Sequence, residues 1–466
     1  MASGAPHDFF ATSRSGVADL ELRRKLEKTT GRHLEQVAAT RAEFPPFDHE
    51  RDAARRIKED AIGRLDQLLL QLKDRLEANG AKVFVAADAE EARDYILKVA
   101  RGCGAKRVVK GKSMATEEIE LNPALAQAGI EAIETDLGEY IVQLRHEPPS
   151  HIITPAIHLS KEDIGGLFSE KLGIPFTTEP ERLTTVARER LRPIFLSADM
   201  GITGANFAIA ETGTLVLVEN EGNGRLSSTM PEVFVALMGI EKVIPRLADL
   251  PHFLEVLART ATGQKLTCYT NFISRPRGKG EIDGPREMHV VMLDNGRSAM
   301  LADPVLREAL YCLRCGACLN VCPVYRRIGG HAYGSAYPGP IGSIVSPSLF
   351  GSAAAHLPFA STLCGACRDI CPVKIDIPRI LLHLRWKESV GDGLPTVQFP
   401  RDVRRARRGL ERFARMARHP RLMRIASRIA GLTLRPFARG GWIRRMPGAF
   451  RNWTSTRDFP LPGSRR

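Results

Sequence analysis

The chain has 466 residues, of which 43% are hydrophobic, 26% charged and 6% aromatic. This composition excludes a wholly disordered or fibrous protein, and the length predicts about two or three domains. No stretch approaches the roughly 20 consecutive apolar residues that a membrane-spanning helix needs. The first residues lack a basic stretch followed by an apolar core, so we expect no secretory signal and a cytoplasmic location.

The net charge of +14 is concentrated at one end of the chain. Residues 391–466 contain nineteen arginines, no lysine and four acidic residues, a net charge of +15, so residues 1–390 are close to neutral. We therefore treat 391–466 as a separate Arg-rich C-terminal region, since concentrated charge of this kind indicates binding to a partner or a surface and not a type of fold. A basic amphipathic helix is predicted over 404–434, suited to an acidic protein or to the inner face of a membrane.

Residues 1–60 predict an N-terminal helical segment, with one helix over 16–41. A second helix is expected over 53–78, because apolar residues recur there at spacings of three and four. The Asn79-Gly80 pair predicts its end. The recurring apolar residues are typical of core packing.

Residues 61–297 predict an α/β domain, because short apolar runs alternate with helical stretches such as 90–100. The first expected strands cover 81–86, 107–110, 130–134 and 151–154. Helix-length connections between apolar runs are typical of a parallel or mostly parallel sheet.

A hairpin is predicted within that sheet, where Glu211-Thr212-Gly213 separates apolar runs over 205–210 and 214–219. Further strands are expected over 235–237, 266–270 and 288–293. A turn at Asp294-Asn295-Gly296 predicts the end of the α/β domain, near residue 297.

Seven of the nine cysteines lie in two groups between residues 312 and 371. The first group has the spacing C-x2-C-x2-C-x3-C-P and consists of Cys312, Cys315, Cys318 and Cys322. The second group consists of Cys364, Cys367 and Cys371. It repeats the spacing without the first cysteine, whose place is taken by Ser361. Thiolates two residues apart can surround one face of an iron–sulfur cube, while the fourth points toward a second cube.

Zinc and disulfide bonds, the two alternatives to iron–sulfur binding, fit these cysteine groups poorly. Structural zinc sites use four ligands, often as two separated pairs, and seven cysteines do not divide into sets of four. A disulfide framework is typical of small secreted chains, and no export signal is present in the sequence. Residues 303–390 therefore predict an iron–sulfur domain.

In two-cluster ferredoxins the fourth cysteine of each motif serves the cluster of the other motif. That rule assigns Cys312, Cys315, Cys318 and Cys371 to cluster 1. It assigns Cys322, Cys364 and Cys367 to cluster 2 and leaves one corner open. Ser361 is a poor default ligand there, because an alkoxide at neutral pH is far costlier than a thiolate. A water, a buried carboxylate, a residue from a partner and a three-iron cluster are the alternatives.

Two glycine-containing segments of the α/β region resemble nucleotide-binding loops only in part. Residues 110–113 (KGKS) end like a phosphate-binding loop, but Lys106 stands where the pattern needs its first glycine. Residues 222–227 lack the third glycine of a dinucleotide-binding motif, and we find no flavin motif. The residues at strand ends or loops that could still form a small-molecule site are Lys112, Ser113, Glu211, Thr212 and Asn220.

Several motifs resemble those of the lactate utilization protein B family, the iron–sulfur subunits of bacterial lactate oxidation. In the cysteine region the similar segments are Cys312–Tyr325, Gly329–Gly334, Tyr337–Gly342 and Cys364–Pro378. In the α/β region they are Lys110–Glu118, Glu134–Tyr140, Pro149–His158, Asp199–Val218 and Asn220–Met230. The resemblance covers about residues 60–390 and rests on several independent motifs.

This resemblance implies a lactate-utilization α/β domain over 61–297, similar to the sugar-phosphate isomerase and CoA-transferase class of fold. It implies a mainly α-helical, two-cluster ferredoxin-like domain over 303–390, with two [4Fe–4S] clusters. Cluster 2 would then have three cysteine ligands and be convertible to [3Fe–4S]. The family works with companion lactate-utilization proteins to convert L-lactate to pyruvate, so the implied role is electron transfer to an acceptor.

Three functions follow from these features. We expect an iron–sulfur electron-transfer subunit of an L-lactate-oxidising complex that is not a complete enzyme alone. The alternative is an α/β enzyme acting on an acyl or phosphorylated small molecule, with structural or regulatory clusters. Nucleic-acid binding through the Arg-rich region is disfavoured, because that region has few aromatic residues for base stacking.

Overall fold

The computed structural model describes residues 7–390, 401–446, 451, 454 and 457–462. The chain forms two compact units, Met1–Val397 and Gln398–Arg466. The α/β region and all seven clustered cysteines belong to the first unit. The boundaries predicted at 60/61 and 297/303 lie inside this unit and stay predictions.

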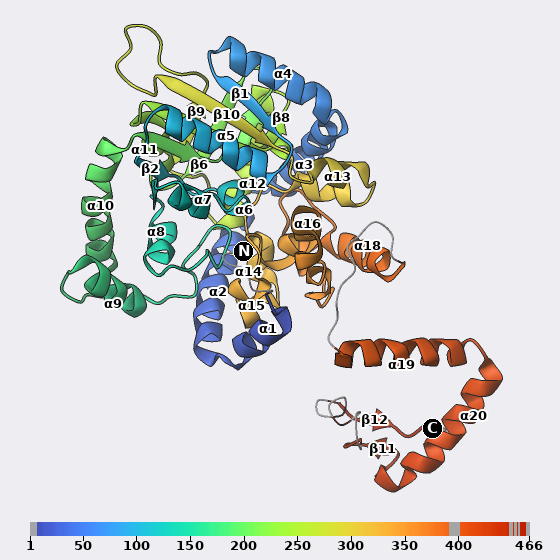
Figure 1. Ribbon diagram of the computed structural model, residues 1–466. Coiled ribbons are helices and arrows are strands. Elements are labelled where there is room, and N and C mark those ends of the chain that lie inside the picture. The colour runs from blue at the N-terminus through green and yellow to red at the C-terminus, as the bar shows by residue number, and fades with distance from the viewer. Residues whose placement is uncertain (1–6, 391–400, 447–450, 452–453, 455–456, 463–466) are drawn as a thin grey trace. The chain divides into compact units, whose positions relative to one another are not determined.

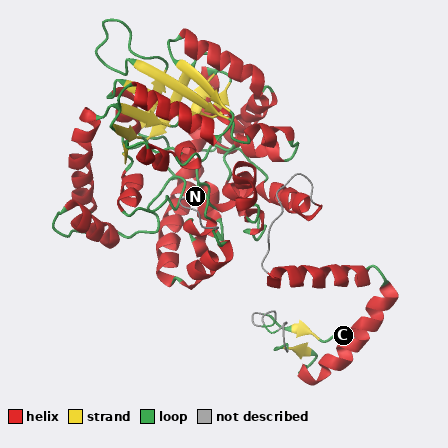
Figure 2. Ribbon diagram, viewed as in Figure 1, coloured by secondary structure: helices red, strands yellow, loops and turns green. Residues whose placement is uncertain are grey.

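Six parallel strands form the main sheet of the first unit, in the spatial order β1-β10-β7-β4-β2-β3 (Figures 1 and 2). The strands are β1 (Lys82–Ala86), β2 (Arg107–Lys110), β3 (Glu131–Glu134), β4 (Met200–Thr203), β7 (Val233–Gly239) and β10 (Glu287–Leu293). The predicted parallel α/β sheet is confirmed. Strand β4, which no prediction covered, lies between β7 and β2.

Helices cover both faces of this sheet. On one face lie α5 (Ala89–Gly102) and α7 (Leu121–Gln127), which pack against Val235 and Leu237 of β7. Phe234 and Met238 of the same strand belong to a second core that also contains side chains of α4 and α12. A strand buried on both faces needs a continuous apolar run, and β7 has one.

Four further strands form a separate sheet in the order β8-β5-β6-β9. Their bounds are Val243–Ile244 (β8), Phe207–Ile209 (β5), Thr214–Glu219 (β6) and Tyr269–Ile273 (β9). The predicted hairpin is present as β5 and β6, but its placement in the main sheet was wrong. After β4 the chain leaves the main sheet, and β5 pairs with β8 instead. The strand predicted over 266–270 begins later, at Tyr269.

The strand predicted over 151–154 was wrong, because this segment is a loop. The His151 Nδ1 atom accepts the backbone N–H groups of Ile153 and Thr154, at 3.1 and 3.2 Å. Ile152 is buried in the core that also contains the cysteines. The apolar character of the segment therefore reflects contact with the cysteine region.

The N-terminal segment is helical, but each of its two predicted helices is divided. The helices are α1 (Phe9–Ala18), α2 (Leu20–Ala42), α3 (Phe47–Gly63) and α4 (Leu65–Ala78). Asp19 separates the first pair, because its side chain accepts the N–H of Leu22 and caps a new helix. Arg64 separates the second pair, because its backbone angles, φ −131° and ψ 39°, are not helical. Helix α4 ends at Asn79, as predicted.

The cysteine region is mainly helical, as the family resemblance implies. Its helices include α14 (Ala317–Val321), α15 (Tyr325–Ile328), α16 (Gly339–Phe350), α17 (Ala366–Ile370) and α18 (Ile377–Val390). Helices α14 and α17, which lie within the two cysteine motifs, contact each other. The N-terminal helices α1 and α2 pack against α15, and α12 (Leu250–Ala261) packs against α3.

The described part of the second unit has two α-helices, α19 (Arg401–Ala417) and α20 (Pro420–Leu434). The single helix predicted over 404–434 was therefore wrong, since Pro420 begins a new helix. Short strands β11 (Trp442–Ile443) and β12 (Phe459–Pro460) form an antiparallel pair. Within the described parts of both units, every helix is too short or too polar to cross a membrane.

Candidate iron–sulfur centre and adjoining pocket

The two cysteine motifs make the same backbone turn. Arg314 and Leu363, each directly before a cysteine, have left-handed φ values of 61° and 56°. The glycines two residues further on, Gly316 and Gly365, have φ values of 72° and 87° and lead into α14 and α17. Residues other than glycine rarely adopt positive φ, so its recurrence at matching positions shows that both motifs share one local fold.

Four of the predicted ligands form the first set of thiols. Burial raises the pKa of Cys315, and the thiols of Cys312 and Cys371 raise it further. Burial raises the pKa of Cys371 to about 11, with Cys312 contributing. The pKa of Cys318 is raised by burial and then by Cys312 and Cys315. The thiol of Cys371, from the second motif, therefore lies near the thiols of Cys312 and Cys315 in the first motif.

The remaining three predicted ligands form the second set. Burial raises the pKa of Cys367 to about 12, and Cys322 and Cys364 add to this rise. Burial also raises the pKa of Cys322, again with a contribution from Cys364. Cys318 interacts weakly with Cys367, so the two sets adjoin.

These donors fit iron–sulfur clusters. All seven are sulfur atoms, and Cys315, Cys322, Cys367 and Cys371 are buried. Burial favours the neutral thiol, whereas a cluster binds the thiolate. Cluster binding would therefore release the thiol protons. The two cysteines outside the motifs, Cys103 and Cys268, are exposed and belong to neither set.

Arginines of the N-terminal segment hold the second motif, which the sequence did not predict. The Nε and Nη2 atoms of Arg51 donate to the carbonyl oxygen of Cys371 at 3.1 and 2.7 Å. Arg51 Nη2 also donates to the Asp369 carbonyl at 2.9 Å, and Arg41 Nη2 donates to that of Ile370 at 2.9 Å. These carbonyls end helix α17, so the two arginines fix the backbone that carries Cys371.

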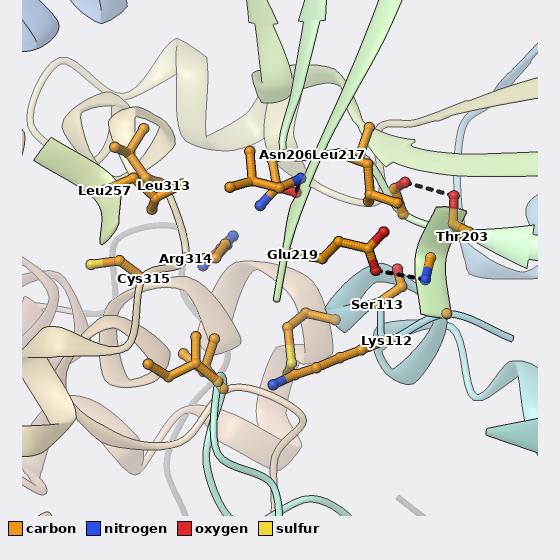
Figure 3. A pocket seen from close by; sticks show the side chains of 18 of the residues that line it. Lys112, Ser113, Thr203, Asn206, Leu217, Glu219, Leu257, Leu313, Arg314 and Cys315 are labelled. Carbon is orange, nitrogen blue, oxygen red and sulfur yellow. Dashed lines mark hydrogen bonds between the residues drawn. The ribbon is translucent and has the colours of Figure 1, made fainter. Parts of the chain in front are cut away.

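A pocket of about 320 Å³ lies where the α/β region meets the cysteine region (Figure 3). Its α/β side is formed at the carboxyl ends of strands β2, β3, β4 and β7, where ligands bind in open parallel sheets. The cysteine region contributes Leu313, Arg314, Cys315 and Tyr337. The pocket therefore shares a wall with the first set of thiols.

Three of the five candidate small-molecule residues line this pocket, namely Lys112, Ser113 and Asn220. Glu211 and Thr212 do not line it. They lie at the hairpin turn between β5 and β6, where the Glu211 carboxylate accepts the N–H of Leu247 at 2.9 Å. Arg314, which no sequence pattern marks as a pocket residue, enters from the opposite side to Lys112 (Figure 3).

A buried network of charges fixes the wall between the two regions. Both Nη atoms of Arg297 donate to the Glu118 carboxylate at 2.8 Å, and its Nε donates to Glu241 at 2.5 Å. The Tyr337 hydroxyl donates to Glu118 at 2.7 Å. Although burial opposes ionisation, Arg297 holds the pKa of Glu241 at about 2. The guanidinium of Arg314 lies 4.3 Å from the centre of the Tyr337 ring, so the network positions Arg314 as well.

Comparisons with known proteins agree with this two-part arrangement. A family model described as the LUD domain matches residues 69–293, and one described as a 4Fe-4S dicluster domain matches residues 308–375. A crystal structure of a DUF162 family protein from Deinococcus radiodurans covers 49% of this chain and 98% of its own, at 18% identity. Its TM-score is 0.28, too low to support any conclusion.

Relatives match almost the whole chain. Lactate utilization protein B of Macrococcus caseolyticus is 43% identical, over 96% of this chain and 93% of its own length. The protein of that name from Bacillus pumilus is 42% identical, over 97% of this chain and 94% of its own length. The chain, with a LUD α/β domain followed by a 4Fe–4S dicluster region, therefore belongs to the lactate utilization protein B family.

Proposed function

We propose that the protein is the iron–sulfur electron-transfer subunit of a complex that oxidises L-lactate to pyruvate. The observation that carries this proposal is the gathering of seven thiols into two adjoining sets. The name of the relatives supports lactate utilization as the setting. Companion lactate-utilization proteins would supply the chemistry on lactate itself, since this sequence has no flavin or nicotinamide motif.

The cysteines divide between two [4Fe–4S] clusters by the crossed rule in this proposal. Cluster 1 takes Cys312, Cys315, Cys318 and Cys371, and cluster 2 takes Cys322, Cys364 and Cys367. The electrostatic neighbours of the buried thiols support this division. Bound clusters supply one-electron transfer.

The chain's own residues adjust and protect this centre. The backbone N–H of Arg314 donates to Cys312 Sγ at 3.3 Å, and that of Tyr325 donates to Cys322 Sγ at 3.5 Å. Hydrogen bonds to ligand sulfur offset negative charge and raise a cluster's reduction potential. The surrounding apolar core, which includes Leu319 and Tyr333, excludes water from the four buried thiols.

The Arg-rich region would dock the protein on an acidic companion or on the inner face of the membrane, from the cytoplasm. Helices α19 and α20 expose large apolar side chains among their arginines, namely Leu410, Phe413, Leu422, Ile425, Ile429 and Leu432. A helix with an apolar face and a basic face is suited to such a surface. The acidic companion or the membrane would then contact the second unit of the chain.

The function is tested by anaerobic co-purification with the companion proteins, followed by addition of L-lactate. We expect lactate to reduce the clusters, as seen by electron paramagnetic resonance, with D-lactate as the matched control. Clusters that dithionite reduces but L-lactate leaves oxidised in the complete complex would contradict the proposal.

The pocket favours a second candidate, an α/β enzyme acting on an acyl or phosphorylated small molecule. In that case the clusters would be structural or regulatory. A Cys312→Ser variant separates the two candidates within the complex. Loss of lactate-driven electron flow supports the electron-transfer subunit, whereas unchanged turnover supports the second candidate.

A further inference from the structure

Among the described residues, three of the four cations in the pocket wall form no side-chain hydrogen bond to a carboxylate. They are Lys112, which follows β2, Lys242, which precedes β8, and Arg314 of the cysteine region. Neither lysine forms a salt bridge within the described part of the chain, although Lys242 and Glu241 interact electrostatically. The Arg314 side chain is 8% exposed, and within the described chain its Nε and Nη1 atoms have no hydrogen-bond partner. Its nearest carboxylate contact, from Nη2 to Glu241, is 3.7 Å long.

The acidic residues of the same wall, in contrast, all accept backbone N–H groups or pair with an arginine. They are Asp136, Glu219, Glu221 and Glu241. Glu219 accepts the backbone N–H groups of Gly224 and Arg225 at 2.7 and 2.8 Å, and Glu241 pairs with Arg297. Asp136 and Glu221 each accept one backbone N–H, and burial together with the nearby Asp136 carboxylate raises the pKa of Glu221 to about 7. A buried guanidinium without hydrogen bonds is costly, so the unmet demand in this pocket is for an anion.

The charge balance and shape of the pocket limit what this anion is. Four basic and four acidic side chains line it, so the wall has no large positive excess to offset the two or more charges of a phosphate ester. Arginine beside a tyrosine ring offers a planar fork that fits a carboxylate. Leu217, Met238 and Leu257 give part of the wall an apolar surface for the rest of the molecule.

We propose that this pocket binds a small organic monocarboxylate, with its carboxylate between Arg314 and the two lysines. The site goes beyond electron transfer, because it gives the α/β region a ligand of its own. Cys315, of the first thiol set, lies in the same wall, so the bound carboxylate would lie beside cluster 1. Binding would then alter the electrostatic environment of that cluster.

The test measures binding to the anaerobically purified full chain, without companion proteins. Pyruvate and L-lactate are the carboxylate probes, and inorganic phosphate is the comparison. We expect saturable calorimetric binding of at least one carboxylate and a change in the cluster 1 resonance spectrum. Lys112→Gln and Lys242→Gln should each weaken binding by about tenfold, the loss of one charge-assisted contact. Lys98→Gln, an exposed lysine of α5 outside the pocket, is the matched control.

Three results would overturn the site. They are absence of binding to chain that holds its clusters, tighter binding of phosphate than of either carboxylate, and equal affinities for the pocket variants and the control. Unchanged cluster spectra before ligand addition establish that each variant has folded. Because companion proteins are omitted, failure here leaves the electron-transfer proposal standing, and failure of lactate-driven reduction leaves this site standing.

Discussion

Ser361 occupies in the second cysteine motif the place that Cys312 occupies in the first. The N–H of Leu363 donates to Ser361 Oγ at 3.1 Å, and the N–H of Arg314 donates to Cys312 Sγ at 3.3 Å. Both donors have left-handed backbones, so the two turns share a backbone conformation and a hydrogen bond, to a hydroxyl in one and a thiol in the other. The second motif thus keeps the shape of a ligand loop without its sulfur.

Ser361→Cys should therefore close the open corner of cluster 2. An iron atom without a thiolate is the one most easily lost on oxidation, so mild air exposure of the natural protein should produce a three-iron signal from one cluster. The variant should suppress that signal, as measured by electron paramagnetic resonance. Thr362→Cys adds a thiol at the next, exposed position and should leave the conversion unchanged. Equal three-iron signals in Ser361→Cys and the natural protein would contradict this geometry.

Cys371→Ser should damage cluster 1, although Cys371 lies in the second motif. Its thiol interacts with those of Cys312 and Cys315, and crossed ligation makes it the fourth ligand of their cluster. Spectra of the variant should retain the cluster that converts to the three-iron form and lose the other. Cys103→Ser, at an exposed position outside both sets, should keep both. Loss of cluster 2 alone in Cys371→Ser would show that each motif holds its own cluster.

Local sequence patterns predicted the parts of the fold whose causes are local. The continuous apolar run of β7 reflects burial on two faces, and Asn79-Gly80 ends α4 as expected. The strand predicted over 151–154 was wrong. The isoleucines of this segment contact the cysteine region, while its backbone turns around His151. Apolar composition alone does not separate a short strand from a buried loop.

The cysteine sets were predictable for a different reason, namely that ligand spacing is fixed by the geometry of a cluster. The contact of Arg51 with the Cys371 carbonyl joins distant parts of the chain, so no local pattern reports it. The pocket could not be predicted for the same reason. Lys112 was a candidate from its loop, but Arg314 comes from the cysteine region. Only the packing of the two regions places them in one wall.

A histidine contact between the α/β and cysteine regions should make stability depend on pH. Burial and the neighbouring His331 ring lower the pKa of His158 to about 4, against the opposing Glu147 carboxylate 2.9 Å away. Arg145, also nearby, acts in the same direction as His331. Between pH 4 and 6.5 the unfolded chain binds a proton here that the folded chain does not, so stability falls as pH falls across this window.

His158→Gln removes this contribution, which is at most about 1.4 kcal/mol per pH unit for one group. The thermal midpoint of the variant should therefore fall less than that of the natural protein between about pH 7 and about pH 5.5. His49→Gln changes an exposed histidine of α3 and should reproduce the natural slope. Identical slopes for His158→Gln and the natural protein would refute the assignment.

Removing residues 398–466 should leave both clusters in place, because every clustered cysteine precedes this unit. The truncated chain should lose most of its sedimentation with anionic lipid vesicles or with an acidic companion, since the net charge of +16 in 398–466 goes with it. Salt should weaken the association of the full chain, and zwitterionic vesicles should bind neither form. Undiminished vesicle binding after truncation would place the docking surface elsewhere.

The central claim is that the seven clustered cysteines hold two iron–sulfur clusters, and direct analysis of the anaerobically purified chain tests it. Iron, acid-labile sulfide and zinc are measured together per chain. We expect about eight iron and about eight sulfide, or about seven iron if the open corner has lost its metal, with no stoichiometric zinc. Stoichiometric zinc without labile sulfide would contradict the account.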